Sequence, residues 1–206
     1  MKSRLKKQRS VISMVLGLVL VLPFVTVHSA ESIKPILGDD GLYHQSWFLT
    51  SFMDLKEDLA EAQAEGKRFA VLWEQKGCPY CRDLHTINFA DPKINKYVRE
   101  NFVVLQLNMW GDREVTDFDG ETLPEKAIAR KWGVVFTPTM QFFVEESELK
   151  AGKGGRDQMV WMMPGYFRKG HFLGSFEFVK ERIYEKRHFQ KYIGEKLAAE
   201  SPSGDH

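Results

Sequence analysis

The sequence predicts one α/β domain in which a small β-sheet is covered by helices on both faces. Two short apolar runs, Phe69–Trp73, which is unbroken, and Phe102–Leu107, are typical of strands that are buried on both faces. Between and after these runs, apolar residues recur at spacings of three and four, which indicates amphipathic helices. This alternation of strands and helices places the chain in the α/β class, and its 206 residues are enough for one globular core.

The N-terminal half of the domain is expected to contain three helices around the first strand. Asp91 and Pro92 provide an N-cap and a first-turn proline for the last of them. The first helix has apolar positions at Phe52, Leu55, Leu59 and Ala62 and ends near Gly66. The second follows Cys81 and runs to about Asn88, and the third runs from Asp91 to Glu100.

The C-terminal half continues the alternation. Asp119-Gly120 fits a hairpin turn, and residues 122–125 have the spacing of a capping box with Pro124 in the first turn, which predicts a helix to about Lys131. The remaining expected elements are strands at Met140–Val144 and Gln158–Met163, a helical face at Phe172, Phe176, Val179 and Ile183, and its continuation at Phe189, Ile193 and Leu197.

The first thirty residues have the order of a secretory signal peptide. Five basic residues precede an uncharged, largely apolar run from Val11 to about Val27, and the small residues Ser29 and Ala30 follow. Cleavage after Ser29 or Ala30, or retention as an uncleaved anchor, fits this pattern. We therefore expect residues 1–30 to be a leader, 31–46 a linker or an incoming strand, 47–186 the main domain, and 187–206 a helical extension and tail outside the cytoplasm.

The charge balance excludes a nucleic-acid-binding patch. The leader holds five of the 29 Lys and Arg residues and none of the 28 Asp and Glu residues, so the remainder has 24 basic against 28 acidic residues and a net charge of about −4. A strongly basic surface, which nucleic-acid recognition requires, is therefore not expected.

The only two cysteines stand in the motif Cys78-Pro79-Tyr80-Cys81, at the expected junction of a strand and a helix. A disulfide across two residues closes too short a loop to stabilise the fold, so redox chemistry is the better explanation. At a helix N-terminus, the Cys78 thiolate would be stabilised by backbone N–H groups and act as the nucleophile. Cys81, one turn deeper, would resolve the mixed disulfide.

Other roles for the cysteine motif remain open at this stage. Half of a zinc site, or a copper site, would use both cysteines with His85. Gly77 would let a partner backbone approach closely or simply provide a turn, while Pro79 and Tyr80 would tune the redox potential. Lys76 is either a surface charge or a group that favours the Cys78 thiolate.

These motifs resemble the thioredoxin superfamily, and in particular the periplasmic SoxW-like thioredoxins. The similarity covers roughly residues 46–184 and is carried by Trp73–His85, Ala129–Val134, Thr137-Pro138-Thr139 and Pro164-Gly165-Tyr166. It implies a thioredoxin fold, with a central mixed sheet flanked by helices and an extended C-terminal helical segment. It further implies that Pro138 has a cis peptide bond and lies against Cys78, and that the backbone of Thr137 binds an extended substrate.

One position departs from the family pattern. Cytoplasmic thioredoxins carry a buried aspartate six residues before the first cysteine, where it assists proton transfer, and this chain has Leu72 there. Glu74 would lie on the same strand face and could replace it as proton acceptor. The alternative is a solvated glutamate at the end of the strand.

The resulting functional prediction is an extracytoplasmic, periplasmic thiol-disulfide oxidoreductase that reduces partner proteins and needs no cofactor besides the Cys78–Cys81 couple. The resemblance implies disulfide-containing partners, a membrane thiol-electron donor and a place in a sulfur-oxidation system. Some Dsb oxidases or isomerases share the Pro-Tyr dipeptide, and a Dsb-like thiol oxidase or isomerase therefore remains an alternative. A metal-binding or chaperone module is the alternative of another class.

Overall fold

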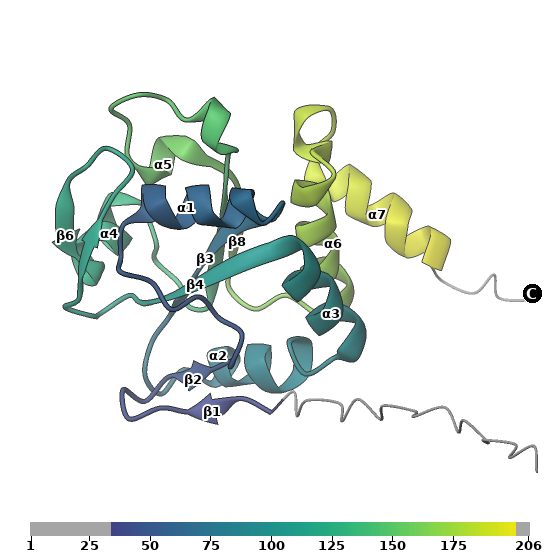
Figure 1. Cartoon of the computed structure of the whole chain (residues 1–206). Coiled ribbons are helices and arrows are strands. Elements are labelled where there is room, and N and C mark those ends of the chain that lie inside the picture. The colour runs from purple at the N-terminus through teal and green to yellow at the C-terminus, as the bar shows by residue number, and fades with distance from the viewer. Residues whose placement is uncertain (1–33, 201–206) are drawn as a thin grey trace, which may run out of the picture. The chain divides into compact units, whose positions relative to one another are not determined.

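A four-stranded mixed sheet lies at the centre of the computed structural model, which describes residues 34–200 (Figure 1). The strand order is β4-β3-β7-β8; β3 pairs with β4 in parallel and with β7 in antiparallel orientation, and β7 pairs with β8 in antiparallel orientation. The strands of this sheet are β3 (Arg68–Glu74), β4 (Phe102–Asn108), β7 (Thr139–Phe143) and β8 (Met159–Pro164).

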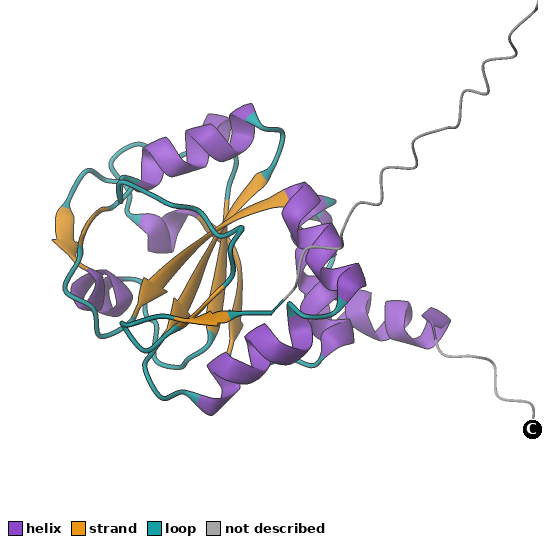
Figure 2. Ribbon diagram, turned by 60° about the horizontal axis from the view of Figure 1, so that its bottom comes forward, coloured by secondary structure: helices purple, strands orange, loops and turns teal. Residues whose placement is uncertain are grey.

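Helices cover both faces of this sheet (Figure 2). The longer segments are α1 (Leu55–Ala64), α3 (Pro92–Asn101), α6 (Lys169–Lys180) and α7 (Phe189–Glu200). The shorter segments are α2 (Pro79–Asp83), the π-helical η1 (Leu84–Asn88), α4 (Glu125–Lys131), α5 (Gly155–Gln158), and the 3-10 turns η2 (Glu146–Glu148) and η3 (Ile183–Glu185).

Strand β3 separates two apolar clusters. Every residue of β3 is buried, and its alternate side chains point to opposite faces of the sheet. Ala70 and Leu72 join the cluster that contains side chains of α3, α6 and α7, whereas Phe69, Val71 and Trp73 join the cluster that contains side chains of α1 and α4. The predicted α/β class and both buried strands are therefore confirmed.

Helix α1 begins later than predicted. The Asp54 side chain accepts hydrogen bonds from the backbone N–H groups of Lys56 and Glu57, which makes Asp54 the N-cap. Met53 has φ of 67°, a conformation that no helix can include, and Phe52 is fully exposed. The assignment of Phe52 to the apolar helix face was therefore wrong.

The capping box predicted at residues 122–125 is also wrong. Thr122–Pro124 forms strand β6, which pairs with β5 (Glu114–Thr116), and α4 starts only at Glu125. The Glu125 carboxylate is buried and accepts hydrogen bonds from the backbone N–H of Asn108 and from Arg113. These tertiary partners replace the local hydrogen bond that a capping box would make. The turn at Asp119-Gly120 does join the two strands, as predicted.

The segment before the main sheet, expected to be a linker or an incoming strand, forms a β-hairpin of its own. Strand β1 (Ile36–Leu37) pairs with β2 (Tyr43–His44), and Gln106 Nε2 of β4 donates a 2.8 Å hydrogen bond to the carbonyl of Tyr43. Figure 1 shows this hairpin beside α2. The predicted leader, residues 1–30, and the polar tail, residues 201–206, lie outside the described residues.

The C-terminal helix packs on the rest of the fold. Phe189 and Ile193 of α7 are each 5% exposed and belong to the same apolar cluster as Phe172 and Phe176 of α6. The apolar side chains predicted for this segment therefore pack against the core. Within residues 34–200, no helix combines the length and the apolar character that crossing a bilayer requires.

Asp58 on α1 gives the stability of the fold a pH dependence. Burial raises the pKa of this carboxyl to about 6, although it accepts a 2.7 Å hydrogen bond from Ser51 Oγ. Between the ordinary pKa of about 3.9 and that value, the folded chain binds more protons than the unfolded chain. The free energy of unfolding should therefore fall as the pH rises from about 4 to about 6.

We expect Asp58→Asn to abolish this slope and to raise the free energy of unfolding at pH 8 by on the order of 1 kcal/mol, because the variant buries no charge. Urea titrations of both proteins at pH 4.5 and pH 8 measure the difference. Equal changes of stability with pH in the two proteins would contradict the assignment.

Candidate active site at the Cys78–Cys81 disulfide

The two cysteines lie where β3 leaves the sheet and α2 begins. Cys78 is the N-cap of α2, and it forms a disulfide with Cys81, whose Cα lies 5.2 Å away. The connecting turn includes Gly77 with φ of 74°, a conformation that side chains disfavour. Turn geometry alone therefore accounts for this glycine. Its role in substrate approach stays a prediction.

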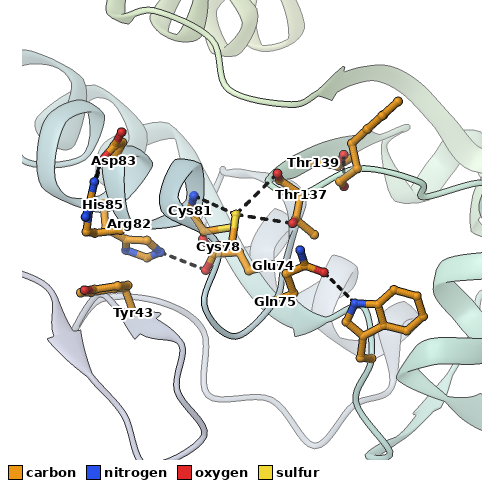
Figure 3. The surroundings of a disulfide bond; sticks show 12 residues. Tyr43, Glu74, Gln75, Cys78, Cys81, Arg82, Asp83, His85, Thr137 and Thr139 are labelled. Carbon is orange, nitrogen blue, oxygen red and sulfur yellow. Dashed lines mark hydrogen bonds and ion pairs between the residues drawn. A yellow bond between two sulfur atoms is a disulfide. The ribbon is translucent and has the colours of Figure 1, made fainter.

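Two hydrogen-bond donors point at the sulfur of Cys78 (Figure 3). The Cys81 backbone N–H lies 3.1 Å from Cys78 Sγ, and the Thr137 hydroxyl lies 3.5 Å from it. The Thr137 carbonyl oxygen is 3.6 Å from the same sulfur. Cys78 can donate a hydrogen bond to this oxygen only when it is reduced and protonated. In the reduced protein these two donors would favour the thiolate form of Cys78.

The peptide bond between Thr137 and Pro138 is cis, as the resemblance implied. Pro138 is buried, and its carbonyl accepts a 2.8 Å hydrogen bond from Gly165 N–H. Val135 and Phe136, just before it, are 70% and 61% exposed. An apolar strip thus adjoins the segment that contacts the reactive sulfur.

Aromatic side chains flank the disulfide as well. Tyr80, between the cysteines, is 59% exposed and stacks on Tyr166 with ring centroids 5.9 Å apart. Burial and the negative charge of Asp83 raise the pKa of Tyr166, so its hydroxyl stays protonated and donates to Asn88 at 2.8 Å. Trp110 is also exposed, and its indole N–H donates to Gln75.

Glu74 is completely buried, so the alternative of a solvated glutamate is wrong. Its Oε2 lies 3.0 Å from His85 Nε2 and also accepts a hydrogen bond from Gln106 Nε2. Figure 3 shows the Glu74 carboxylate between the imidazole and the cysteine pair. Leu72, at the position of the family aspartate, lies in the apolar cluster on the same face of β3.

His85 was considered from the sequence only as a metal ligand. The structure instead directs one ring nitrogen to Glu74 and the other to Gln45 Nε2 at 3.3 Å, and the ring is fully buried. Among residues 34–200, no group of three or more His, Cys, Asp or Glu side chains has a metal-binding arrangement.

A cavity of about 350 Å³ connects the disulfide to Glu74. Its walls come from the N-terminal hairpin, the turn after β3 and α2, and they include Tyr43, Glu74, Lys76, Cys81 and Arg82. A larger cavity of about 690 Å³ lies along α3 and the start of β4 and contains neither cysteine. We assign the candidate site to the smaller cavity because the reactive groups line it.

Sequence reasoning missed three contributors to this site: Gln45, Gln106 and His85 as a partner of Glu74. Gln106 carried a signal, because it is the one polar residue within the run Phe102–Leu107. A polar side chain in a buried strand requires a hydrogen-bond partner. Gln45 carried no comparable signal, since its segment showed no periodicity.

The sequence matches the thioredoxin-like domain family over residues 55–180, which is more than half of the chain. The chain belongs to the thioredoxin-like family. A thioredoxin-fold protein from Helicobacter pylori has a similar structure, with a TM-score of 0.50 and 18% identity, over 65% of this chain and 81% of that one. A thioredoxin from Thermus thermophilus is 29% identical, with a TM-score of 0.45, over 61% of this chain and 83% of that one.

A search of curated proteins finds no significant match. The family assignment and the geometry agree on the coarse description: a thioredoxin-like domain whose Cys-x-x-Cys motif forms a disulfide at the start of a helix. The N-terminal hairpin that lines the cavity precedes the matched region of this thioredoxin-like chain.

We expect Thr137→Val to raise the pKa of the Cys78 thiol in the reduced protein, because the variant keeps the shape of the side chain and removes its hydroxyl. A hydrogen bond to a charged group contributes about 1.5–3 kcal/mol, and this one is long, so alkylation of Cys78 at pH 6.5 should slow roughly three- to tenfold. Mass spectrometry after iodoacetamide treatment measures the rate. Thr86→Val, at an exposed threonine bonded to the Arg82 carbonyl, is the control. Equal rates in all three proteins would show that the Thr137 hydroxyl has no effect.

Proposed function

We propose that this chain is an extracytoplasmic thiol-disulfide oxidoreductase that reduces disulfides of partner proteins. The observation that supports the proposal most directly is the environment of Cys78 Sγ, which has the Cys81 N–H at 3.1 Å and the Thr137 hydroxyl at 3.5 Å. A sulfur held in this way is suited to leave as a thiolate when the disulfide opens, and to attack as one in the reverse step.

The reaction follows from the positions of the two sulfurs. The Cys78 thiolate attacks one sulfur of a substrate disulfide, the substrate S–S bond breaks, and a substrate thiolate leaves. Cys81 then loses its proton and attacks Cys78 Sγ, which releases the second substrate thiolate and forms the Cys78–Cys81 disulfide. Counted from the dithiol form, the protein loses two electrons and two protons, and the substrate gains them. Cys78 is 9% exposed and Cys81 3%, which favours Cys78 as the attacking group.

Substrate binding would involve the segment that contains the cis peptide. Thr137 lies against the reactive sulfur, which supports pairing of its backbone with an extended substrate chain. The exposed side chains of Tyr80, Trp110 and Phe136 offer apolar contacts to residues that flank the substrate cysteine. Glu74 would accept the proton of Cys81, since both line one cavity.

The cellular setting is proposed from the sequence. The basic and apolar order of residues 1–30 favours export to the periplasm, where partners carry disulfides. The resemblance to SoxW-like proteins favours a role in a sulfur-oxidation system and a membrane thiol-electron donor. A cytoplasmic location of the full-length protein after fractionation would remove this part of the proposal.

Replacing the resolving cysteine should trap the mixed disulfide. We expect reduced Cys81→Ala, incubated with an oxidised disulfide-containing model protein, to accumulate a covalent adduct through Cys78, because no second thiol releases it. Non-reducing electrophoresis and mass spectrometry detect the adduct. Cys78→Ala is the control and should form far less. No adduct in Cys81→Ala, together with stoichiometric metal on the unmodified protein, would favour a metal-binding module instead.

The equilibrium potential of the Cys78–Cys81 couple decides the direction of exchange. We expect a strongly reducing value, near that of thioredoxin at about −270 mV, for a reductase. Equilibration with glutathione or dithiothreitol buffers and quantification of the free thiols give the value. A potential near the periplasmic oxidants, about −120 mV, would replace the reductase by a Dsb-like oxidase.

A further inference from the structure

Four polar side chains form a hydrogen-bonded network behind the disulfide, which we call the carboxylate network: Gln45, Glu74, His85 and Gln106. Each is less than 9% exposed, and Glu74 and His85 are fully buried. They come from the end of the N-terminal hairpin, from β3, from η1 and from β4. Side chains from four separate segments thus form one network that includes the Glu74 carboxylate.

The hydrogen-bond directions follow from the partners. Gln106 Nε2 donates a 2.8 Å hydrogen bond to the Tyr43 carbonyl, which can only accept, and the same amide nitrogen donates to Glu74 Oε2. Gln45 Nε2 faces His85 Nδ1 at 3.3 Å. With Nδ1 as acceptor, Nε2 carries the N–H that donates to Glu74 Oε2.

The carboxylate is therefore held asymmetrically. Oε2 accepts two hydrogen bonds, whereas Oε1 is buried and accepts none from the described residues. A buried carboxylate oxygen without a partner is unfavourable, so its retention calls for an explanation. Glu74 and Cys81 line the same cavity, and reduction of the disulfide would give Cys81 a thiol proton.

We propose that His85, Gln106 and Gln45 are positioning residues, which hold Glu74 so that Oε1 takes the proton from Cys81. The inference rests on the proposed function. In the resolving step the S–H bond of Cys81 breaks, its proton moves to Oε1, and the thiolate attacks Cys78 Sγ. The leaving substrate thiolate takes up a proton, and Glu74 returns its own to solvent through the cavity. No further oxidant or reductant takes part.

Other titratable groups surround this carboxylate. Tyr43, Lys76 and Arg82 line the cavity with it, and Arg113 donates to the carbonyl of Gln106. Tyr43 and these three cations therefore contribute to any pH dependence measured at the site. The test must compare variants at one position, so that these groups stay constant.

The hairpin gains a role from this assignment. Gln45 lies within hydrogen-bond distance of His85 Nδ1, and the Tyr43 carbonyl fixes the amide of Gln106. Both residues precede the region matched by the thioredoxin-like family, residues 55–180. The positioning of the proton acceptor thus depends in part on residues outside the matched region.

The test measures how fast the mixed disulfide between Cys78 and glutathione is resolved. Reduced protein is mixed with oxidised glutathione, quenched with acid at intervals from pH 5.5 to 8.5, and analysed by mass spectrometry. We expect Glu74→Gln to prolong the lifetime of the adduct roughly a hundredfold at pH 6.5, and His85→Leu about tenfold. His85→Gln keeps a donor for Oε2 and should recover to within about threefold of the unmodified protein. His44→Leu, at the hairpin histidine that pairs with Asp40, should match the unmodified protein.

The pH profile separates positioning from loss of fold. In Glu74→Gln the resolution rate should rise about tenfold per pH unit up to the thiol pKa, because only the spontaneously ionised thiol reacts. The pH profile of His85→Leu should move toward that of Glu74→Gln. Formation of the adduct, which needs only Cys78, should stay within about twofold in every variant. Resolution in His85→Leu as fast as in the unmodified protein, or slow resolution in His85→Gln with an unchanged pH profile, would overturn the inference. Failure of the unmodified protein to form the adduct would instead overturn the proposed function.

Discussion

The burial of β3 between two hydrogen-bonded neighbours is the constraint on which the candidate site depends. Its register with β7 places Trp73 opposite Thr139, so the segment before β7, which contains Thr137 and Pro138, lies beside the turn after β3. Trp73 strengthens this alignment through a 2.7 Å hydrogen bond to Gln141. The two halves of the site, the cysteine motif and the cis-proline segment, meet because these two strands pair.

The same strand also fixes the chemistry available to the second cysteine. Alternation along β3 puts Leu72 and Glu74 on one face, and the two positions are separated by roughly 7 Å along the strand. Leu72 completes an apolar cluster, whereas Glu74 lies at the end of the strand, where His85 of η1 and Gln106 of β4 supply polar partners. A carboxylate at position 74 therefore has different neighbours from those that a carboxylate at position 72, two residues earlier on the strand, would have.

The sequence was sufficient for the fold class, the central strands and the cysteine motif, because each has a local pattern, whereas the cis-proline was implied by the family resemblance. The expected helix start at Phe52 failed since the conformation of Met53 is set by tertiary contacts, and the expected capping box failed because Glu125 pairs with Arg113. The link between Gln45 and His85 spans 40 residues and has no local signature. Such contacts depend on topology, which the spacing of residues does not encode.

The π-helical turn η1 has a consequence for protein engineering. Its wider hydrogen-bond ring, as in Phe89 N–H to the Leu84 carbonyl, accommodates one residue more than a regular turn, and His85 lies within it. In an uninterrupted α-helix, each residue added or removed rotates those that follow by about 100°. Transplanting only Cys78–Cys81 into another scaffold would therefore transfer the sulfurs without the imidazole contact, and a graft that retains it must extend at least through Asn88.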